Sequence, residues 1–419
     1  MKNPKEGRFM SCRRPSTSKA PHKKADKQNR RSFAVNRRPS PAAQARGQLF
    51  VWRPSRRNCG SRRFGAYSGE HDISADAETV QMDQMIGKIG DVPLVGVTRA
   101  GLVENVHRGR ICVVSADGGK VIEAHGDVEA KTYVRSTAKP LQAIASLLGG
   151  VDRACGWEDR HLAMMAASQR GYPEQMEALG EMLSSSGVPE EALAFHPYKP
   201  TASGPRDEWA KEGGKPRKLY HTCAGKHLGM LAWCRLNGWP LAGYTEPDHP
   251  SQQEITRRVL AWTGTDESDS AIGRDGCGLP VAAIPMSRIA LGYARLACPD
   301  AAPDPDAAQA ASRVAAAMNR YPDLVEGPGR LASLLLRDPN VVAKSGAQGL
   351  FAIGLRRERL GIAIHVSDGT EAAWPYIVMS LLERYGGVEE ATMSALTSRF
   401  PAALMNDAGA IAGTWKPLV

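Results

Sequence analysis

The pattern of apolar and polar positions divides the chain near residue 90. Between Met1 and Arg63 the apolar residues follow neither a helical nor a strand period, and Arg, Lys, Ser, Pro and Asn dominate. Such a stretch cannot bury enough apolar surface to offset the entropy that is lost on ordering. We therefore predict that residues 1–90 are a disordered basic N-terminal extension and that residues 91–419 form the folded domain.

After this boundary, runs rich in Val and Ile predict strands, and apolar residues at helical spacing predict helices. The predicted strands are 93–98, 110–115, 120–124, 349–353 and 359–366. The predicted helices are 136–148, 160–167, 175–185, 223–236, 250–263, 307–318 and 372–385. Strands on both sides of a helical middle predict a mixed α/β or α+β fold.

The charge follows the same division. The formal net charge is +10, but residues 1–69 hold 19 Lys and Arg against two acidic residues, and the rest of the chain is mildly acidic. A basic tail of this kind suits nucleic-acid binding, a transit-type extension or translation that starts too early, with Met82 or Met85 as the true start. We expect nucleic acid to bind, if at all, only through this tail.

Cysteine usage and apolar runs indicate the compartment. Eight cysteines are scattered along the chain, too sparsely for a disulfide framework. No apolar run approaches the roughly 18 residues that a membrane-spanning helix needs. We therefore expect a cytoplasmic protein that has no membrane partner.

The first motif with candidate chemistry is Arg135-Ser136-Thr-Ala-Lys139-Pro140. On a helix, Ser136 and Lys139 share one face because they are three residues apart. A Lys with a lowered pKa can accept the proton of a neighbouring Ser hydroxyl and make the oxygen a nucleophile. Serine β-lactamases and transpeptidases use this Ser-x-x-Lys spacing. Taken alone, however, the spacing favours an N-cap Ser followed by a surface Lys.

Two further motifs carry thiols, and they are His221-Thr-Cys223-Ala-Gly-Lys226-His227 and Asp275-Gly276-Cys277-Gly278. On a helix, Cys223 and Lys226 lie on one face, and glycines on both sides of Cys277 permit a sharp turn that exposes its thiol. Two thiolates with a nitrogen or carboxylate ligand suit zinc in an open site. On spacing alone, two buried structural cysteines are the better interpretation.

Two loops complete the set of candidate motifs. The segment Ala343-Lys344-Ser-Gly-Ala-Gln348-Gly349 places a Lys before small residues that let the backbone approach a ligand, although a surface turn has the same composition. In Tyr244-Thr-Glu-Pro-Asp-His249-Pro-Ser-Gln252, we expect His249 to order a Pro-flanked loop rather than to act as a base.

In this order the motifs resemble the L-asparaginase II family of the thermolabile rhizobial type. The resemblance spans residues 93–417 and is carried by Arg135-Ser-x-x-Lys-Pro-x-Gln142, Cys223-Ala-Gly-Lys-His227-x-Gly-Met-Leu231, His249-Pro-x-Gln252, Asp275-Gly-Cys-Gly-x-Pro280, Ala343-Lys-x-Gly-Ala347 and Asn406-x-x-Gly409. It implies a fold like that of the serine β-lactamases and penicillin-binding proteins, with an antiparallel sheet and a helical region. It also implies an amidohydrolase that releases ammonia from L-asparagine through a serine acyl-enzyme and, by analogy, a homodimer.

The resemblance also assigns roles to individual residues. It implies two Ser-Lys tandems, which are Ser136 with Lys139 and Ser168 with Lys344. It implies a zinc site whose ligands are Cys223, Lys226 and Cys277. The substrate-binding residues that it implies are Arg135, Asp275 and Gly276. Ser136 is the first candidate for the nucleophile, and Ser168 stays open as the second.

The sequence departs from the family pattern near these residues. Ser-His-x-Gly-Glu reads Ser168-Gln169-Arg-Gly-Tyr172 here, Gly-Ala-Glu-Gly reads Gly-Ala-Gln348-Gly, and His365 stands where a Lys is expected. Losing a His and a Glu can change the substrate or lower the activity. Three alternatives therefore stay open: a divergent paralogue for another small amide or ester, a different acyl-serine enzyme such as a β-lactamase or peptidase, and a catalytically inactive binding protein.

Overall fold

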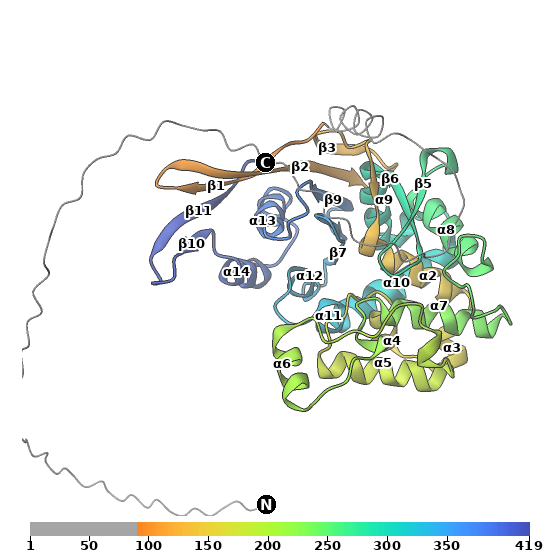
Figure 1. Ribbon diagram of the computed structural model, residues 1–419. Coiled ribbons are helices and arrows are strands. Elements are labelled where there is room, and N and C mark those ends of the chain that lie inside the picture. Colours follow the sequence, from red (N-terminus) through yellow and green to blue (C-terminus); the bar gives the residue numbers. More distant parts are fainter. Residues whose placement is uncertain (1–89) are drawn as a thin grey trace, which may run out of the picture. The chain divides into compact units, whose positions relative to one another are not determined.

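The computed structural model describes residues 90–419, and the predicted extension before Gly90 lies outside the described residues. An antiparallel sheet stands beside a group of helices (Figure 1). This arrangement confirms the mixed α/β class, the antiparallel sheet and the helical region that we predicted. None of the helices in this part of the chain is both long and apolar enough to cross a membrane.

The main sheet of the described chain has eight antiparallel strands in the order β10-β11-β1-β2-β9-β8-β7, with β3 beside β2. The strands are β1 (Val92–Arg99), β2 (Leu102–Ser115), β3 (Val121–His125), β7 (Val341–Ser345), β8 (Leu350–Leu355), β9 (Leu360–Val366), β10 (Ala403–Met405) and β11 (Ile411–Pro417). Strand β9 pairs with β2, so the C-terminal strands return to the first hairpin. A smaller sheet joins β4 (Lys131–Tyr133), β6 (Pro280–Pro285) and β5 (Ala271–Arg274).

The helices of the described chain fall into two groups. Those of the helical region and the sheet face beside it are α2 (Lys139–Leu148), α3 (Val151–Cys155), α4 (Asp159–Met165), α5 (Pro173–Ser186), α6 (Ser203–Lys211), α7 (Ala224–Leu236), α8 (Pro250–Thr263), α9 (Met286–Ala297), α10 (Pro305–Arg320) and α11 (Pro322–Glu326). Those on the opposite face of the sheet are α12 (Leu331–Leu335), α13 (Trp374–Tyr385) and α14 (Glu390–Arg399).

The sheet separates two hydrophobic cores. Along β8, Leu350 and Ala352 point toward the core shared with α9 and the helical region, whereas Phe351 and Ile353 point toward the core shared with α12 and α13. The alternation follows from the two-residue period of a strand. Because helices cover both faces, β7, β8 and β9 are buried along almost their whole length.

Two differences from the predicted elements position the candidate site. The predicted helix 136–148 divides, because Arg135–Ala138 is a 3₁₀ turn and α2 begins only at Lys139, with Pro140 in its first turn. A surface turn is wrong for the first half of the segment from Ala343, since Val341–Ser345 is the buried strand β7. Both lysines of the predicted tandems therefore start from buried backbone.

Candidate active site

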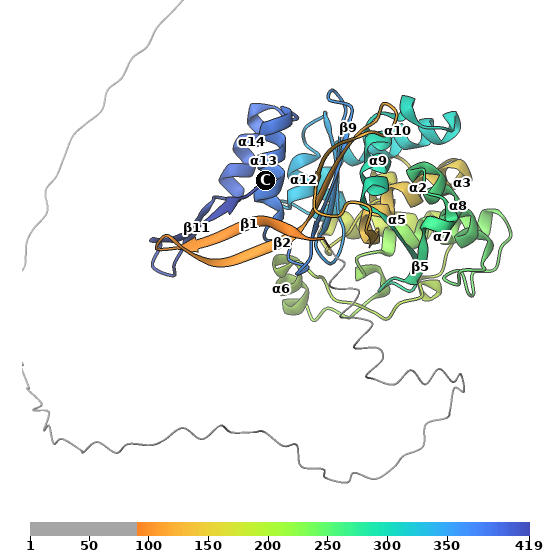
Figure 2. The ribbon, with the colours of Figure 1, turned by 90° about the horizontal axis from the view of Figure 1, so that it is seen from above.

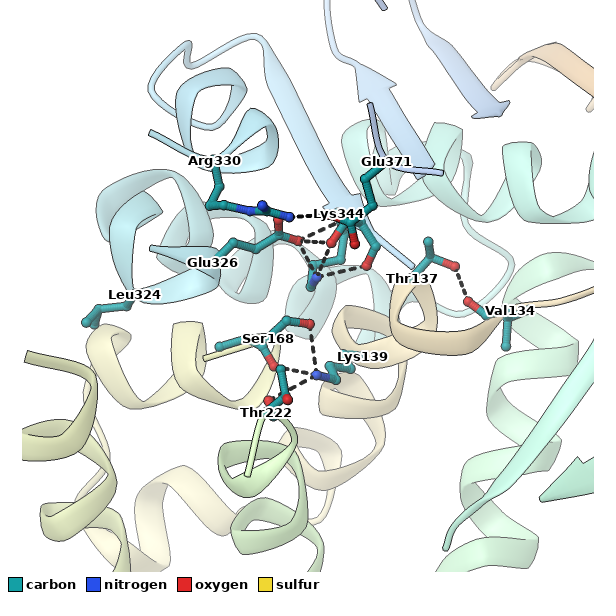
Figure 3. A network of polar contacts seen from close by, with 12 residues as sticks. Val134, Thr137, Lys139, Ser168, Thr222, Leu324, Glu326, Arg330, Lys344 and Glu371 are labelled. Atoms are coloured by element: carbon teal, nitrogen blue, oxygen red, sulfur yellow. Dashed lines mark hydrogen bonds and ion pairs between the residues drawn. The ribbon is translucent and has the colours of Figure 1, made fainter. Parts of the chain in front are cut away.

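Lys139 is the buried centre of the candidate site. Its side chain has no exposed surface. Its Nζ lies 2.7 Å from the Ala167 carbonyl oxygen, 3.0 Å from Ser168 Oγ and 3.3 Å from the Thr222 carbonyl oxygen (Figure 3). Ala167 and Ser168 follow the end of α4, and Thr222 precedes α7, so three segments meet at one amine. Burial lowers the pKa of Lys139 below its ordinary value of 10.5.

The three partners of Lys139 determine what the amine does in each protonation state. An ammonium has three N–H donors, and all three oxygens can accept one. A neutral amine has two N–H donors and one lone pair. Because the carbonyls of Ala167 and Thr222 can only accept, the Ser168 hydroxyl is the one partner of the three that can donate to the lone pair. The geometry therefore suits transfer of the Ser168 proton to Lys139.

Ser136 is placed differently from what its spacing predicts. It is partly exposed in the 3₁₀ turn Arg135–Ala138. Within residues 90–419 its hydroxyl makes no hydrogen bond, whereas Lys139 turns inward and hydrogen-bonds to Ser168. The structure thus brings together Lys139 of the first predicted tandem and Ser168 of the second.

Arg135 and Asp275, both predicted to bind substrate, form an ion pair beside this turn. Arg135 Nε lies 2.9 Å from Asp275 Oδ1, and the backbone N–H of Gly276 donates to the same oxygen at 2.9 Å. Arg135 has a φ of 43°, and a left-handed conformation of this kind costs a non-glycine residue about 1–3 kcal/mol. The ion pair offsets part of this cost and keeps a guanidinium and a carboxylate next to Ser136.

Lys344 is held by a carboxylate rather than by Ser168. It forms an ion pair with Glu326, in which the two side chains are 0% and 1% exposed. Its Nζ also donates to the Ser345 carbonyl at 2.9 Å and to Ser345 Oγ at 3.3 Å. Among the described residues, no hydrogen bond joins Lys344 to Ser168. Sequence reasoning missed Glu326, which belongs to no motif, and treated Ser345 as a variable position in the motif of Lys344.

The two thiols of the predicted zinc site lie together with the predicted lysine ligand. Lys226 Nζ is 3.3 Å from Cys277 Sγ, and the Cys277 thiol donates to Asp275 Oδ2 at 3.7 Å. The neighbouring Cys277 side chain, with the charges of Lys139 and Lys226, holds the pKa of the Cys223 thiol well below its ordinary value. Burial disfavours the charged form of Lys226, but the sulfur groups of Cys277 and Cys223 attract the ammonium and raise its pKa.

These residues fit zinc by the chemistry of their donors. Within residues 90–419, no three His, Cys, Asp or Glu side chains gather as a metal site. The predicted set instead counts the Lys226 amine with the thiols of Cys223 and Cys277, and Asp275 adds a carboxylate beside them. Sulfur with nitrogen or oxygen donors is the combination that zinc prefers.

Gln169, which stands where the family has a His, ties the loop of Ser168 to the segment before α7. Its Nε2 donates to the Leu219 carbonyl at 2.9 Å and to the His221 carbonyl at 2.8 Å, and its Oε1 accepts from the Gly171 N–H at 2.6 Å. The side chain is fully buried. Gln169 therefore holds the segment of Ser168 against the segment of Thr222, and its amide has no exposed surface with which to meet a substrate.

The other departures from the family pattern lie in three separate places of the fold. Tyr172 packs on Gly327, where an added Cβ would lie 2.5 Å from the ring. Tyr172 also lines a cavity of about 450 Å³ between α5 and α11, whose wall does not include Lys139. Gln348 lies in the turn between β7 and β8 with a φ of 57°. His365 lies on β9 and contacts Arg110 at 3.1 Å.

Comparison with known proteins found one family and several similar folds. Residues 95–417 match the L-asparaginase II family, whereas a comparison with curated protein sequences found no match. The structure is similar to a β-lactamase from Mycobacterium bovis, with 14% identity, a TM-score of 0.34, and coverage of 73% of this chain and 98% of that one. It is also similar to Mglu, with 15% identity, a TM-score of 0.36, and coverage of 69% of this chain and 59% of that one.

A third similar structure is simvastatin synthase from Aspergillus terreus, with 12% identity, a TM-score of 0.31, and coverage of 70% of this chain and 91% of that one. These TM-scores are low, and we draw no conclusion about chemistry from them. The family match is of a different kind, because it runs from residue 95 to residue 417 and spans every candidate site residue named above. The chain therefore belongs to the L-asparaginase II family.

Proposed function

We propose that this chain is an amidohydrolase that releases ammonia from L-asparagine through a serine acyl-enzyme. The observation that carries the proposal is the buried amine of Lys139, which meets the Ser168 hydroxyl at 3.0 Å between two carbonyl oxygens. Membership of the L-asparaginase II family supports hydrolysis of a small amide. Of the two candidate nucleophiles, the geometry favours Ser168 over Ser136.

The reaction needs one base, Lys139, which takes a proton from the nucleophile and gives it to the leaving group in each half-reaction. Ser168 Oγ bonds to the side-chain amide carbon of asparagine while its proton moves to Lys139 Nζ. Lys139 then gives the proton to the amide nitrogen, the carbon–nitrogen bond breaks, and ammonia leaves an ester of Ser168. Water attacks the ester carbon as it gives a proton to Lys139, and the proton returns to Ser168 Oγ when the ester bond breaks. Aspartate is released and both residues regain their starting state.

Arg135 and Asp275 are the residues that we propose to orient the substrate. A guanidinium binds carboxylates in a planar, two-point geometry, and an aspartate accepts hydrogen bonds from an ammonium. Asparagine carries both an α-carboxylate and an α-ammonium. The ion pair of Arg135 with Asp275 in the free enzyme can therefore be exchanged for two ion pairs with one substrate molecule.

Ammonia release by the purified chain tests this proposal. We expect release from L-asparagine to exceed release from L-glutamine, because the longer side chain shifts the amide carbon away from Ser168. The product aspartate should appear in equal amount. Release from neither amide would overturn the proposal.

A second candidate function is hydrolysis of a different small amide or ester. Tyr172 favours it, because a neutral ring replaces a family carboxylate next to the segment that carries Glu326. Turnover of nitrocefin would indicate a β-lactamase. Salt-dependent binding of nucleic acid that is lost when residues 1–90 are removed would support a binding protein instead.

Zinc is the cofactor that we propose for the thiols of Cys223 and Cys277 and the amine of Lys226. When bound, it would supply a Lewis acid that helps to orient the substrate. A ligating lysine must be neutral, so binding would release the proton that the nearby thiols hold on Lys226. The proximity of Lys226 Nζ to Cys277 Sγ, at 3.3 Å, supports this assignment.

The zinc proposal predicts a loss of metal on removal of one thiol. The purified chain should contain about one zinc ion, and Cys223→Ser should contain almost none, because a hydroxyl is a poor zinc ligand. Elemental analysis by plasma mass spectrometry measures the content directly. Cys234→Ser is the matched control, since Cys234 is equally buried in α7 but outside the thiol pair. Equal zinc in all three proteins would contradict the assignment.

We also propose that the chain is cytoplasmic, as its cysteine usage indicates, and that it forms a homodimer, as the family resemblance implies. Strands β1, β2 and β11 extend past the helices that cover the rest of the sheet (Figure 2). Their ends expose Leu102 at 75%, Val103 at 67% and Ile411 at 73%, and clustered apolar exposure of this kind favours a partner. Light scattering should give twice the chain mass, and Leu102→Glu should shift it toward the monomer. A monomeric wild type would overturn the proposal.

A further inference from the structure

Glu326, Lys344 and Ser345 form a closed buried cluster that sequence reasoning did not foresee. Glu326 Oε1 forms an ion pair with Lys344. The same oxygen accepts hydrogen bonds from the Ser345 hydroxyl and, at 3.0 Å, from the Ser345 backbone N–H. Lys344 in turn donates to Glu326, to the Ser345 carbonyl and to Ser345 Oγ. Figure 3 shows the cluster next to Ser168 and Lys139.

The hydrogen bonds of this cluster require an ammonium at Lys344. Each of its three N–H groups has an acceptor. A neutral amine would turn its lone pair toward atoms that donate nothing to it, because the Ser345 hydroxyl is already committed to Glu326. Lys139 is the opposite case, since one of its partners can donate to a neutral amine.

The end of α11, whose Glu326 pairs with Lys344, also forms a hydrogen bond with Ser168. The backbone N–H of Ser168 donates to the Val325 carbonyl at 2.7 Å, and Val325 directly precedes Glu326 at the end of α11. Two consecutive residues therefore fix the position of the candidate nucleophile and the charge partner of the second lysine. A displacement of Glu326 would be felt at both places.

Several charged groups surround the cluster. Lys139 on α2 and Arg170, which follows Gln169, both act on Lys344 to lower its pKa. Arg330, before α12, forms an ion pair with Glu371, before α13, and acts with Glu371 on Arg170. Among the described residues, Glu326 is the one carboxylate in contact with Lys344.

We propose that Glu326 is a positioning residue that keeps Lys344 an ammonium, so that the site has one base, Lys139, and one fixed cation, Lys344. The proposal rests on the function proposed above and goes beyond it by dividing the work between the lysines. A fixed cation disfavours protonation of Lys139 by like-charge repulsion. It also stabilises negative charge that develops at the attacked carbonyl oxygen.

The division of work has a pH signature. Burial lowers the pKa of Lys344 to about 8, although Glu326 opposes this shift. Burial favours a neutral Glu326, but the charge of Lys344 lowers its pKa to about 2. Both groups are therefore charged between these values, and activity should fall on the basic side with a midpoint near 8 as Lys344 loses its proton. Removing the carboxylate lowers the pKa of Lys344, so this basic limb should move to lower pH.

Glu326→Gln tests the proposal in the full chain. We expect kcat to fall roughly 10- to 100-fold, the range found for partners that orient metal ligands, and the basic limb of its pH profile to move to lower pH. Glu326→Asp should restore part of both effects, because it restores the charge. Glu371→Gln is the matched control; its partly exposed ion pair with Arg330 should change kcat less than about threefold. An unchanged kcat and pH profile in Glu326→Gln would overturn the proposal.

Folding and activity are separated by two further measurements. Unpairing a buried charge can unfold a protein, whereas replacing both charges by neutral groups is tolerated, so Glu326→Gln/Lys344→Met should fold and stay as inactive as Glu326→Gln. A folded double variant with wild-type kcat would reduce Glu326 to a structural role. NMR titration of ¹⁵N-lysine-labelled protein measures the pKa of Lys344 and requires no turnover. A wild type that does not hydrolyse asparagine would therefore contradict the proposed function but leave the proposed role of Glu326 to be decided by this titration. A Lys344 pKa that Glu326→Gln leaves unchanged counts against the present proposal.

Discussion

Replacing Ser168 by Ala should abolish the release of ammonia from asparagine. Of the three oxygens that contact Lys139 Nζ, the Ser168 hydroxyl is the one that can give the amine a proton, and a methyl group can neither attack the amide nor form the ester. Loss of a serine nucleophile lowers kcat by roughly 10⁴- to 10⁶-fold. The fold should persist, because Ser168 keeps its backbone bond to the Val325 carbonyl. Steady-state ammonia release and circular dichroism together measure both outcomes.

Ser136→Ala is the decisive companion of this variant. Ser136 is next to Arg135 of the Arg135–Asp275 ion pair, but its hydroxyl makes no hydrogen bond within residues 90–419, so its loss should lower kcat far less than the loss of Ser168. Acid quenching during turnover, followed by peptide mass spectrometry, should find the aspartyl ester on Ser168. Full activity of Ser168→Ala, with an ester on Ser136, would show that the Ser-x-x-Lys spacing names the right nucleophile and that Lys139 serves the other serine.

The sequence predicts those parts of the fold whose burial pattern is simple. Strands β8 and β9 were within reach because runs of Val, Ile and Leu are buried on both faces. Strand β2 begins at Leu102, well before the predicted start at residue 110. The prediction missed this first half because its residues are mostly exposed and show no core pattern. Strand β7 carries Lys344 inside the protein, and a lysine in a short apolar run is normally a sign of the surface.

In the site, too, some contacts follow from the motif positions in the sequence and others do not. Family motifs place Arg135 with Asp275, and Lys226 with Cys277, and both contacts are present. The partner of Lys139 is different, because it depends on how the side chain leaves the junction between a 3₁₀ turn and α2. An i, i+3 spacing describes a regular helix and says nothing about that junction. Glu326 meets Lys344 across 18 positions of chain without any local signal.

Replacing Lys139 by Met should remove turnover while the protein stays folded. General acid–base catalysis contributes roughly 10²- to 10⁴-fold, and here one amine serves both half-reactions, so we expect a loss at the upper end of this range. Burying the amine carries a desolvation cost, which methionine removes, and this gain offsets the hydrogen bonds lost by the Ala167 and Thr222 carbonyls. The melting temperature should therefore change little. Lys131→Met, at an exposed position on β4, controls for the substitution itself.

Loss of activity alone does not distinguish a base from a fixed cation at this position, but chemical rescue does. In Lys139→Ala, a small primary amine such as ethylamine can enter the space that the side chain vacates. If Lys139 acts as a base, the rescued rate follows the concentration of the free amine and rises with pH until the added amine is fully deprotonated. If Lys139 acts only as a cation, rescue follows the ammonium form and falls over the same range. The second result would remove Lys139 from the role of base and transfer the question to the other buried amines described near it, Lys344 and Lys226.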